Sequence, residues 1–219
     1  PIVEGSSPSP PAINIEMNVS GVILAAGKGT RMKSNIPKVL HPVSGKKLVL
    51  YALEVIEDIN TKYIVVGHEA EKVIEAVPDS LNVVIQEEQK GTGHAISILL
   101  DDKQFANDTS EYILVIPGDV PMINRDDIKN LIKKVIDSNS SIGFLSSKVS
   151  NPFGYGRVIQ QEGQIKIVEE KDCTEDERLI NEINSGIYCF EKKFLLEHIN
   201  NLNTSVSYTH LRAHETNSH

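Results

Sequence analysis

The residues best suited to chemistry in this sequence are two cations, Arg31 and Lys38, and the carboxylate of Asp119. Arg31 follows the glycine-rich stretch 27–29, where glycines let backbone N–H groups turn toward a phosphate. An arginine fork together with a lysine point charge can hold a triphosphate. Asp119 comes directly after an apolar run, and Mg²⁺ commonly takes one or two carboxylates plus substrate phosphates. Together these residues indicate phosphate chemistry assisted by a divalent metal.

Each of these residues also has an ordinary structural interpretation. The Gly-Lys-Gly stretch is neither a P-loop nor a dinucleotide-binding fingerprint, because Met32 stands where the fingerprint needs its third glycine. The stretch can be a plain tight turn, the cations can be solvated surface charges, and aspartate is common in turns for backbone reasons. The functional interpretation gains weight because Arg31 and Asp119 follow apolar runs expected to end at one edge of a sheet.

A second polar stretch, residues 86–95, precedes a helical pattern. Gln86 carries both an amide donor and an acceptor, which suits the edge of a uracil, and Gly91 lets a flat base approach the backbone. The free N–H groups at the start of a helix add further donors. The alternative is a glycine loop followed by a helix that Thr92 caps.

Further candidates lie in the second half of the chain. Glu169 and Asn184 could hydrogen bond sugar hydroxyls or an acetamido group, although solvated polar groups at strand ends are the simpler explanation for each alone. The two cysteines, Cys173 and Cys189, cannot form a disulfide framework or a four-ligand zinc site. We therefore expect reduced thiols in a cytoplasmic protein.

The elements that must position these residues alternate between short β-branched runs and helical periods, which predicts an α/β fold. Continuous apolar strands suit a parallel sheet buried on both faces. Residues 34–42 should be extended or turn-forming because of their two prolines. Strands are expected over 19–25, 63–67, 82–86 and 112–116, and helices over 47–59, 70–76, 92–100 and 125–137. A mixed or antiparallel extension should follow, with strands over 142–149, 157–159, 165–169 and 185–190.

Length and charge narrow the function classes. The chain has 219 residues, which favours one large domain over two. Its 22 Lys+Arg against 30 Asp+Glu give a formal charge of -8, which argues against a nucleic-acid-binding surface. No stretch approaches the roughly 18 to 20 apolar residues that cross a bilayer, so we expect no membrane association.

Both ends differ from the middle in composition. Residues 1–16 are rich in proline and serine, and we interpret them as a disordered or non-native leader. Residues 204–219 have no apolar period and read like a translated sequencing adapter, so we interpret them as a non-native tail. Residues 17–203 are then the expected domain.

Six motifs in order carry a resemblance to one family over about residues 19–203. They are Leu-Ala-Ala-Gly-Lys-Gly-Thr-Arg-Met at 24–32, Pro-Lys-Val-Leu-His at 37–41, Gln-x-Gly-Thr-Gly-His-Ala at 89–95, Gly-Asp-Val-Pro at 118–121, Gly-Tyr-Gly-Arg at 154–157 and Glu-Ile-Asn-Ser-Gly at 182–186. The sequence resembles the N-terminal uridyltransferase domain of bacterial bifunctional N-acetylglucosamine-1-phosphate uridyltransferase/glucosamine-1-phosphate acetyltransferases.

The resemblance implies a Rossmann-like nucleotidyltransferase fold. It also implies transfer of UMP from UTP to N-acetylglucosamine 1-phosphate with Mg²⁺, giving UDP-N-acetylglucosamine and pyrophosphate. Matching positions place Leu24, Ala25, Ala26, Gly27, Gln86 and Gly91 around the uridine, Arg31 and Lys38 on the phosphates, Gly118 against the substrate, Thr92, Gly156, Glu169 and Asn184 on the sugar side, and Asp119 on the metal.

One departure from the family leaves alternatives open. The family continues beyond Asn203 into a segment with a second metal-ligating asparagine and then into a β-helix that carries the acetyltransferase site. We therefore expect no acetyl transfer, a half-built metal site and a monomer. The alternatives are a chain that binds uridine nucleotides without turnover, and a relative that acts on another sugar 1-phosphate or another nucleotide.

Overall fold

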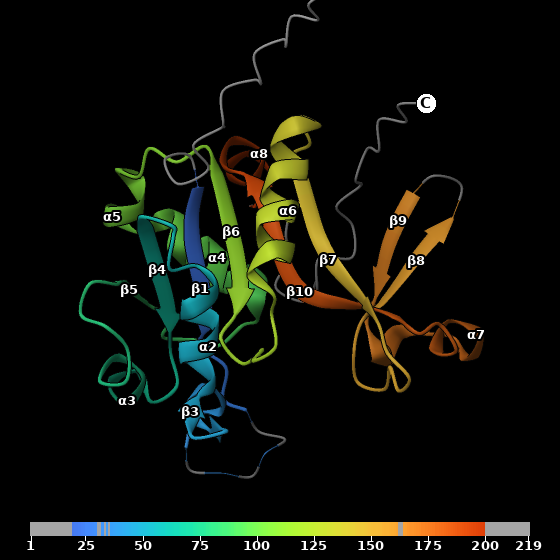
Figure 1. The fold of residues 1–219 in the computed structure, drawn as a ribbon, viewed down its shortest axis with the longest axis horizontal. Helices are drawn as coiled ribbons and strands as arrows, with labels where there is room; N and C mark the ends of the chain where they lie inside the picture. The colour runs from blue at the N-terminus through green and yellow to red at the C-terminus, as the bar shows by residue number, and fades with distance from the viewer. Residues whose placement is uncertain (1–18, 30–31, 33, 35, 162–163, 200–219) are drawn as a thin grey trace, which may run out of the picture.

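Eight strands form one mixed sheet in the part of the chain that the computed structural model describes, residues 19–29, 32, 34, 36–161 and 164–199. Their order is β5-β4-β1-β6-β10-β8-β9, with β7 paired to β10 (Figure 1). Arg31, the expected leader 1–16 and the expected tail 204–219 lie outside the described residues. The α/β class and the antiparallel extension are as the sequence predicts.

Four parallel strands make one half of this sheet. They are β1 (Val19–Ala25), β4 (Thr61–Val66), β5 (Asn82–Ile85) and β6 (Tyr112–Pro117). Ala25 pairs with Val66, and Val66 pairs with Ile85, so these strands end side by side. All four therefore deliver their following loops to the same edge, which lies at the bottom of Figure 1.

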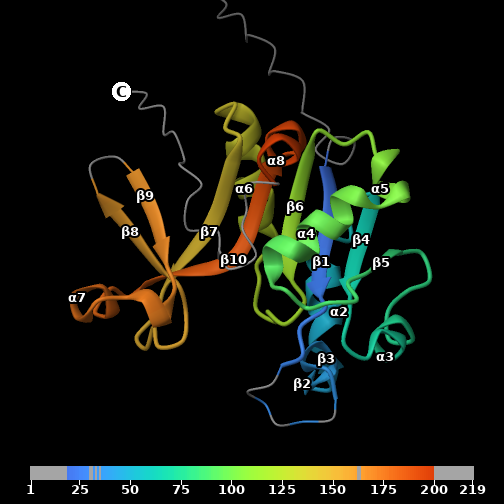
Figure 2. The same cartoon turned by 180° about the vertical axis from the view of Figure 1, so that it is seen from behind.

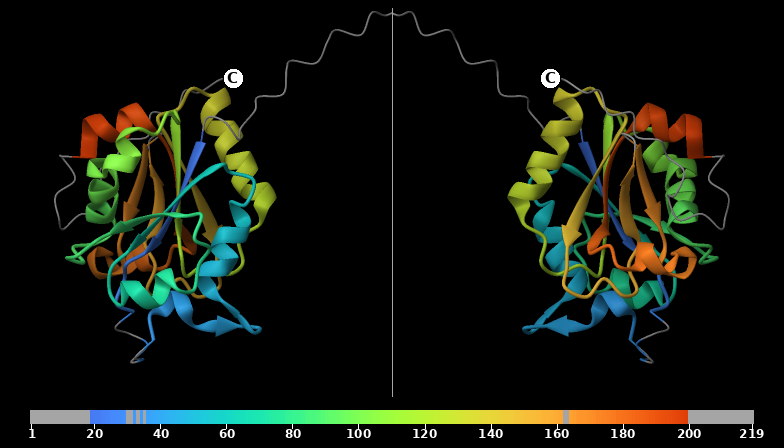
Figure 3. Two further views of the ribbon diagram at one scale, coloured as in Figure 1. Left: turned by 90° about the vertical axis from the view of Figure 1, so that its left-hand side faces the viewer. Right: turned by 90° about the vertical axis from the view of Figure 1, so that its right-hand side faces the viewer.

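Helices cover both faces of this parallel sheet, as two side views show (Figure 3). On one face lie α2 (Leu48–Val55) and α6 (Arg125–Asp137), in front of the strands in Figure 1. On the other lie α4 (Thr92–Asp101), α5 (Lys103–Ala106) and α8 (Lys192–His198), which face the viewer in Figure 2. The short helix α3 (Ala70–Ile74) follows β4. Within the described residues, no helix has both the length and the apolar character that crossing a membrane requires.

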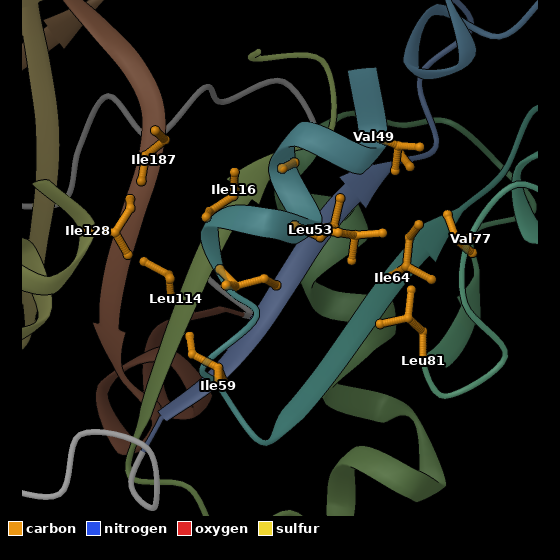
Figure 4. Packing of buried hydrophobic residues seen from close by; sticks show 14 of the residues in the cluster. Val49, Leu53, Ile59, Ile64, Val77, Leu81, Leu114, Ile116, Ile128 and Ile187 are labelled. Carbon is orange, nitrogen blue, oxygen red and sulfur yellow. The ribbon is translucent and has the colours of Figure 1, made fainter. Parts of the chain in front are cut away.

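The core divides into two layers because β1 buries alternate side chains on opposite faces. Ile23 and Ala25 pack with α2, α6 and their neighbours, whereas Val22 packs with α4 and α8 on the other face. Figure 4 shows the side chains of Leu53 from α2 and Ile64 from β4 in the first of these layers, between the helix and the sheet. This two-sided burial explains why the parallel strands are almost continuously apolar.

The prediction of a helix over 47–59 was wrong at its end. The helix α2 stops at Val55, and Ile56 donates its N–H to Leu53, which tightens the chain into a turn. Ile56 and Ile59 are nevertheless buried at 1% and 5% exposure. The apolar period therefore continues through the turn, and it does not mark where the helix ends.

The antiparallel extension is built around one long strand, β10 (Glu182–Glu191). Its second half pairs with β6, and Ile183 pairs with Arg157 of β8, while β7 lies along its other side. The register along β7 shifts between Asn184 and Tyr188. The remaining strands are β7 (Ile142–Lys148), β8 (Arg157–Gln161) and β9 (Gln164–Val168), followed by η3 (Glu170–Asp172) and α7 (Glu175–Arg178).

The segment after the first loop forms a short turn and a hairpin that the apolar pattern does not predict. A 3₁₀ turn, η2 (Lys38–Leu40), lies between the two prolines and buries Val39 and Leu40. A two-stranded hairpin follows, with β2 (Pro42–Val43) and β3 (Lys46–Lys47). The turn-forming character expected for residues 34–42 is thus found, and it positions Lys38.

Candidate active site at the carboxyl edge of the sheet

The first loop, residues 24–27, presents backbone groups rather than side chains to a ligand. Ala25 and Ala26 are 1% and 5% exposed, and their methyl groups pack in the two opposite core layers. Leu24 is half-buried, and its carbonyl accepts the N–H of Gly118 at 2.9 Å. Gly27 is exposed. A ligand reaching residues 24–27 would therefore meet peptide groups, which is how glycine-rich loops hold phosphates.

Lys38 and Asp119 form an ion pair at this edge, with 44% and 27% of their side chains exposed. Val39, next to Lys38, packs close to Gly118, which is buried and precedes Asp119. A Cβ on Gly29 would lie 2.9 Å from the Cβ of Lys38, and Gly29 has φ +59°. The chain at Gly29, just after the first loop, therefore lies against Lys38. Arg31, the other cation proposed for the phosphates, lies outside the described residues.

The carboxylate of Asp119 is the one protein group that the sequence assigns to Mg²⁺. Within the described residues there is no group of three or more histidine, cysteine or acidic side chains that could hold a metal. A single carboxylate still fits Mg²⁺ that is completed by substrate phosphates and water. The site thus suits a metal that arrives with a nucleotide better than one held permanently.

Gln86 lies at the same edge just after β5, which β4 and β1 separate from β6, and it is only 2% exposed. Its side-chain Nε2 donates to the carbonyl of Gly91 at 3.2 Å and to Nδ1 of His94 at 2.9 Å. Its backbone N–H donates to Val66 at the end of β4 at 2.7 Å. These contacts fix the glutamine amide against the start of α4.

Gly91 is the N-cap residue of helix α4, immediately before its first residue. It is exposed, has φ +100°, and a Cβ there would meet no atom within 4 Å. The left-handed φ favours glycine, and the open space leaves the backbone accessible to a flat ring. Thr92 is the first residue of the helix and is exposed; it is not the cap, because Gly91 holds that position without a side-chain hydrogen bond. The capping alternative for Thr92 is therefore wrong.

Three of the four residues expected on the sugar side, Gly156, Glu169 and Asn184, lie close together, whereas no hydrogen bond in the described part of the chain joins Thr92 to them. The N–H of Asn184 donates to the carbonyl of Gly156 at 2.9 Å, and a Cβ on Gly156 would lie 3.3 Å from a carboxylate oxygen of Glu169. A Cβ on Gly186, two residues beyond Asn184, would lie 3.0 Å from Pro117, which precedes Gly118 and Asp119. The second half of the site therefore meets the first at the end of β6.

A family model described as a MobA-like NTP transferase domain matches residues 21–166, two thirds of the chain. The chain belongs to this family. The matched residues of this NTP transferase domain include β4, β5, β6 and most of β1, together with Lys38, Gln86, Asp119 and Gly156, and they stop before Glu169 and Asn184.

Curated relatives of this NTP transferase domain carry the name "Bifunctional protein GlmU". The protein of Clostridioides difficile (strain 630) is 42% identical over 195 residues, 87% of this chain and 42% of its own length. That of Clostridium novyi (strain NT) is 45% identical over 196 residues, again 87% of this chain and 42% of its own length. That of Fervidobacterium nodosum is 40% identical over 184 residues, 84% of this chain and 40% of its own length. The chain spans about two fifths of the length of these relatives.

Two features of this NTP transferase domain escape sequence reasoning. Tyr188 is 2% exposed and lies close to Asn184 and Glu169. Burial raises the pKa of its hydroxyl, and the charge of Glu169 raises it further, whereas a hydrogen bond with Asn184 lowers it. Arg157 is 1% exposed and pairs with Glu170 at 2.7 Å, and Glu170 also accepts the N–H of Gly154 at 3.0 Å. The alternation of side chains along a strand predicts which face Tyr188 and Arg157 occupy. Which partners they meet there depends on how β8, β9 and β10 pair.

The two cysteines carry no site chemistry. Cys173 and Cys189 are free and buried, as the sequence predicts. Burial raises the pKa of the Cys189 thiol to about 12, which keeps it protonated near neutral pH.

Proposed function

We propose that this chain transfers UMP from UTP to N-acetylglucosamine 1-phosphate and releases pyrophosphate, with Mg²⁺. The observation that carries this is the meeting of three parts at one sheet edge: the Lys38–Asp119 pair, the open backbone at Gly91 beside Gln86, and the group formed by Gly156, Glu169 and Asn184. The family supports nucleotidyl transfer, the relatives named GlmU support this branch of it, and the six motifs support uridine and the amino sugar.

The chemistry needs little from acid–base side chains. An oxygen of the sugar phosphate attacks the α-phosphorus of UTP in line, the new P–O bond forms, and the bond to the β-phosphate oxygen breaks so that pyrophosphate leaves with the electron pair. The attacking oxygen is already an anion, so no general base is required. Catalysis then consists of positioning and charge neutralisation.

Each named residue has a part in that positioning. Lys38 would neutralise phosphate oxygens, and the peptide groups of residues 24–27 would line the nucleotide. Asp119 would hold Mg²⁺, which supplies positive charge to the phosphates when bound. Because Lys38 contacts Asp119, nucleotide binding should draw the lysine from the carboxylate to a phosphate. Their partial exposure leaves room for that exchange.

A second candidate function is nucleotide binding without turnover. The observation that favours it is that, among the described residues, no group of three or more acidic, cysteine or histidine side chains could hold a metal. A third is the same reaction on another sugar 1-phosphate, since Glu169 and Asn184 are suited to hydroxyl as well as acetamido groups.

Two measurements on the whole chain separate these functions. Calorimetry with UTP, CTP, dTTP and GTP in the presence of Mg²⁺ gives the nucleotide preference, and we expect UTP to bind most tightly. A pyrophosphate-release assay with N-acetylglucosamine 1-phosphate, glucosamine 1-phosphate and glucose 1-phosphate gives turnover. Binding of UTP with no release from any sugar phosphate selects the second function, and faster release with another sugar selects the third.

A further inference from the structure

The side-chain amide of Gln86 is held by two partners from the segment that follows it. Nε2 lies 3.2 Å from the carbonyl oxygen of Gly91 and 2.9 Å from Nδ1 of His94. The glutamine is 2% exposed, and His94 is half-buried at the third position of α4. Both partners therefore belong to one helix start, which fixes the amide from one side.

These contacts determine which end of the amide points where. A carbonyl oxygen can only accept, so the group facing Gly91 must be the amide nitrogen. Its second hydrogen then goes to Nδ1 of His94, which must accept, so that the ring proton is carried on Nε2. Both donor hydrogens are used, and Oε1 of Gln86 is what the amide has left for a ligand.

We propose that His94 is a positioning residue that sets the base preference of the site by holding Gln86 with its acceptor toward the base. This inference rests on the proposed function and deepens it. An acceptor on Gln86 matches the N3–H donor of uracil or thymine. It meets a lone pair at N3 of cytosine, whereas an amide turned by 180° would present a donor to that lone pair.

The histidine has the larger part in holding this orientation. The carbonyl of Gly91 also accepts the N–H of Ala95 at 3.1 Å, so it is shared between the helix and the amide. The contact to His94 is shorter, at 2.9 Å. If the acceptor at position 94 is removed, only the shared and longer hydrogen bond opposes turning of the amide.

The test compares variants that remove or keep an acceptor at that place. His94→Leu and His94→Met both remove it, so the test can still be made if one of these two variants does not fold. His94→Asn keeps an acceptor, because Oδ1 of asparagine occupies the position of Nδ1. His198→Leu on α8 is the control, since that ring contacts the carbonyl of Phe194 outside the candidate site. For each protein, calorimetry with Mg²⁺ gives the dissociation constants of UTP and CTP, and thermal unfolding establishes that the variant is folded.

The ratio of the CTP to the UTP dissociation constant is the deciding quantity. We expect His94→Leu and His94→Met to lower this ratio by about 3- to 10-fold, the size of one hydrogen bond. His94→Asn and His198→Leu should keep it within about twofold of the wild-type chain, a small part of one hydrogen bond.

An unchanged ratio in the Leu and Met variants, or an equal fall in the Asn variant, would overturn the positioning role while leaving uridine preference intact. A wild-type chain that binds CTP as tightly as UTP would instead overturn the proposed uridine function, and this inference with it.

Discussion

The two edges of the parallel sheet treat polar side chains in opposite ways. At the amino edge, Asp108 is enclosed, with 1% of its side chain exposed, and it accepts from Ser20 at 2.5 Å and from Tyr63 at 3.0 Å. Lys192 donates to its backbone carbonyl at 2.5 Å. At the carboxyl edge, Lys38 and Asp119 pair in the open, with 44% and 27% of their side chains exposed.

The difference separates a structural polar cluster from a candidate functional one. The groups around Asp108 satisfy each other and exclude water, which ties β1 and β4 to the segment before β6. The groups at the carboxyl edge keep part of their hydrogen-bonding capacity for a ligand. Charge alone does not distinguish the edges, since each has one lysine and one aspartate in contact.

The largest expected effect is on turnover at the carboxyl edge. Asp119→Asn removes the carboxylate assigned to Mg²⁺, so pyrophosphate release should fall by about 100-fold or more, and Mg²⁺ should no longer strengthen UTP binding. Thermal unfolding should change little because the side chain is partly exposed. The control is Asp137→Asn, an exposed acidic residue at the end of α6 that lies farthest from this edge. A loss below tenfold would exclude the metal role.

A pair of lysine variants tests the contrast between the edges directly. Lys38→Met should lower pyrophosphate release by about 100-fold, since it removes a phosphate-neutralising charge, with little change in stability. Lys192→Met should do the reverse, lowering the unfolding free energy by about 1 kcal/mol or more and leaving UTP affinity unchanged. The measurements are pyrophosphate release and calorimetry for both, and urea unfolding for both. If both variants changed pyrophosphate release and unfolding free energy in the same way, the distinction between the two edges would be wrong.

Asp108 should govern stability and its dependence on pH. Burial raises the pKa of Asp108, but hydrogen bonds from Ser20, Ser110 and Tyr63 outweigh it and leave the pKa below its ordinary value. The stabilisation is therefore present above the unfolded-state pKa of about 3.9 and is lost as pH falls through the lower folded-state value.

Asp108→Asn should lower the unfolding free energy by about 2 kcal/mol at pH 7, the range for hydrogen bonds to a charged group. The gap to the wild-type chain should narrow below about pH 4, where the unfolded-state carboxylate becomes protonated. Urea unfolding at pH 7, 5 and 3.5 measures both. A gap that does not depend on pH would show that the charge of Asp108 is not what stabilises the edge.

Ser110→Ala should have the smallest effect. The Ser110 hydroxyl contacts that of Ser20 at 2.7 Å, and its loss should cost about 1 kcal/mol of unfolding free energy. The backbone N–H of Ser110 still donates to Asp108 in the variant. UTP affinity by calorimetry should stay the same. Weakened binding would mean that the amino edge is coupled to the site.

Much of the parallel half is predictable from sequence. The strand Val19–Ala25 and the helix Arg125–Asp137 have the predicted bounds, because a glycine-containing loop begins soon after the strand and the clear amphipathic period of the helix lies between Asn124 and Ser138. The common edge of Gln86 and Asp119 follows from parallel topology alone. The short elements were missed, since η2 and α5 contain too few residues for a period to be visible.

Contacts between distant side chains were not predictable in the same way. Gln86 was expected to offer both a donor and an acceptor, yet its donor is occupied by Gly91 and His94. The enclosure of Asp108 by residues 45 and 88 positions away depends on strand order, which no local pattern records. Residue types indicate what chemistry a loop can do, and packing decides which of those capacities remain.

The long strand β10 also sets the spacing between the two halves of the site. Asn184 lies near its start and Tyr188–Glu191 are anchored on β6, with the register shift between them. One inserted residue in that interval would slide the sugar-side end by about 3.3 Å and turn its side chains to the opposite face. An insertion between residues 184 and 188 should therefore be tolerated less well than one in a surface loop, because it would move the sugar-side residues relative to the end of β6.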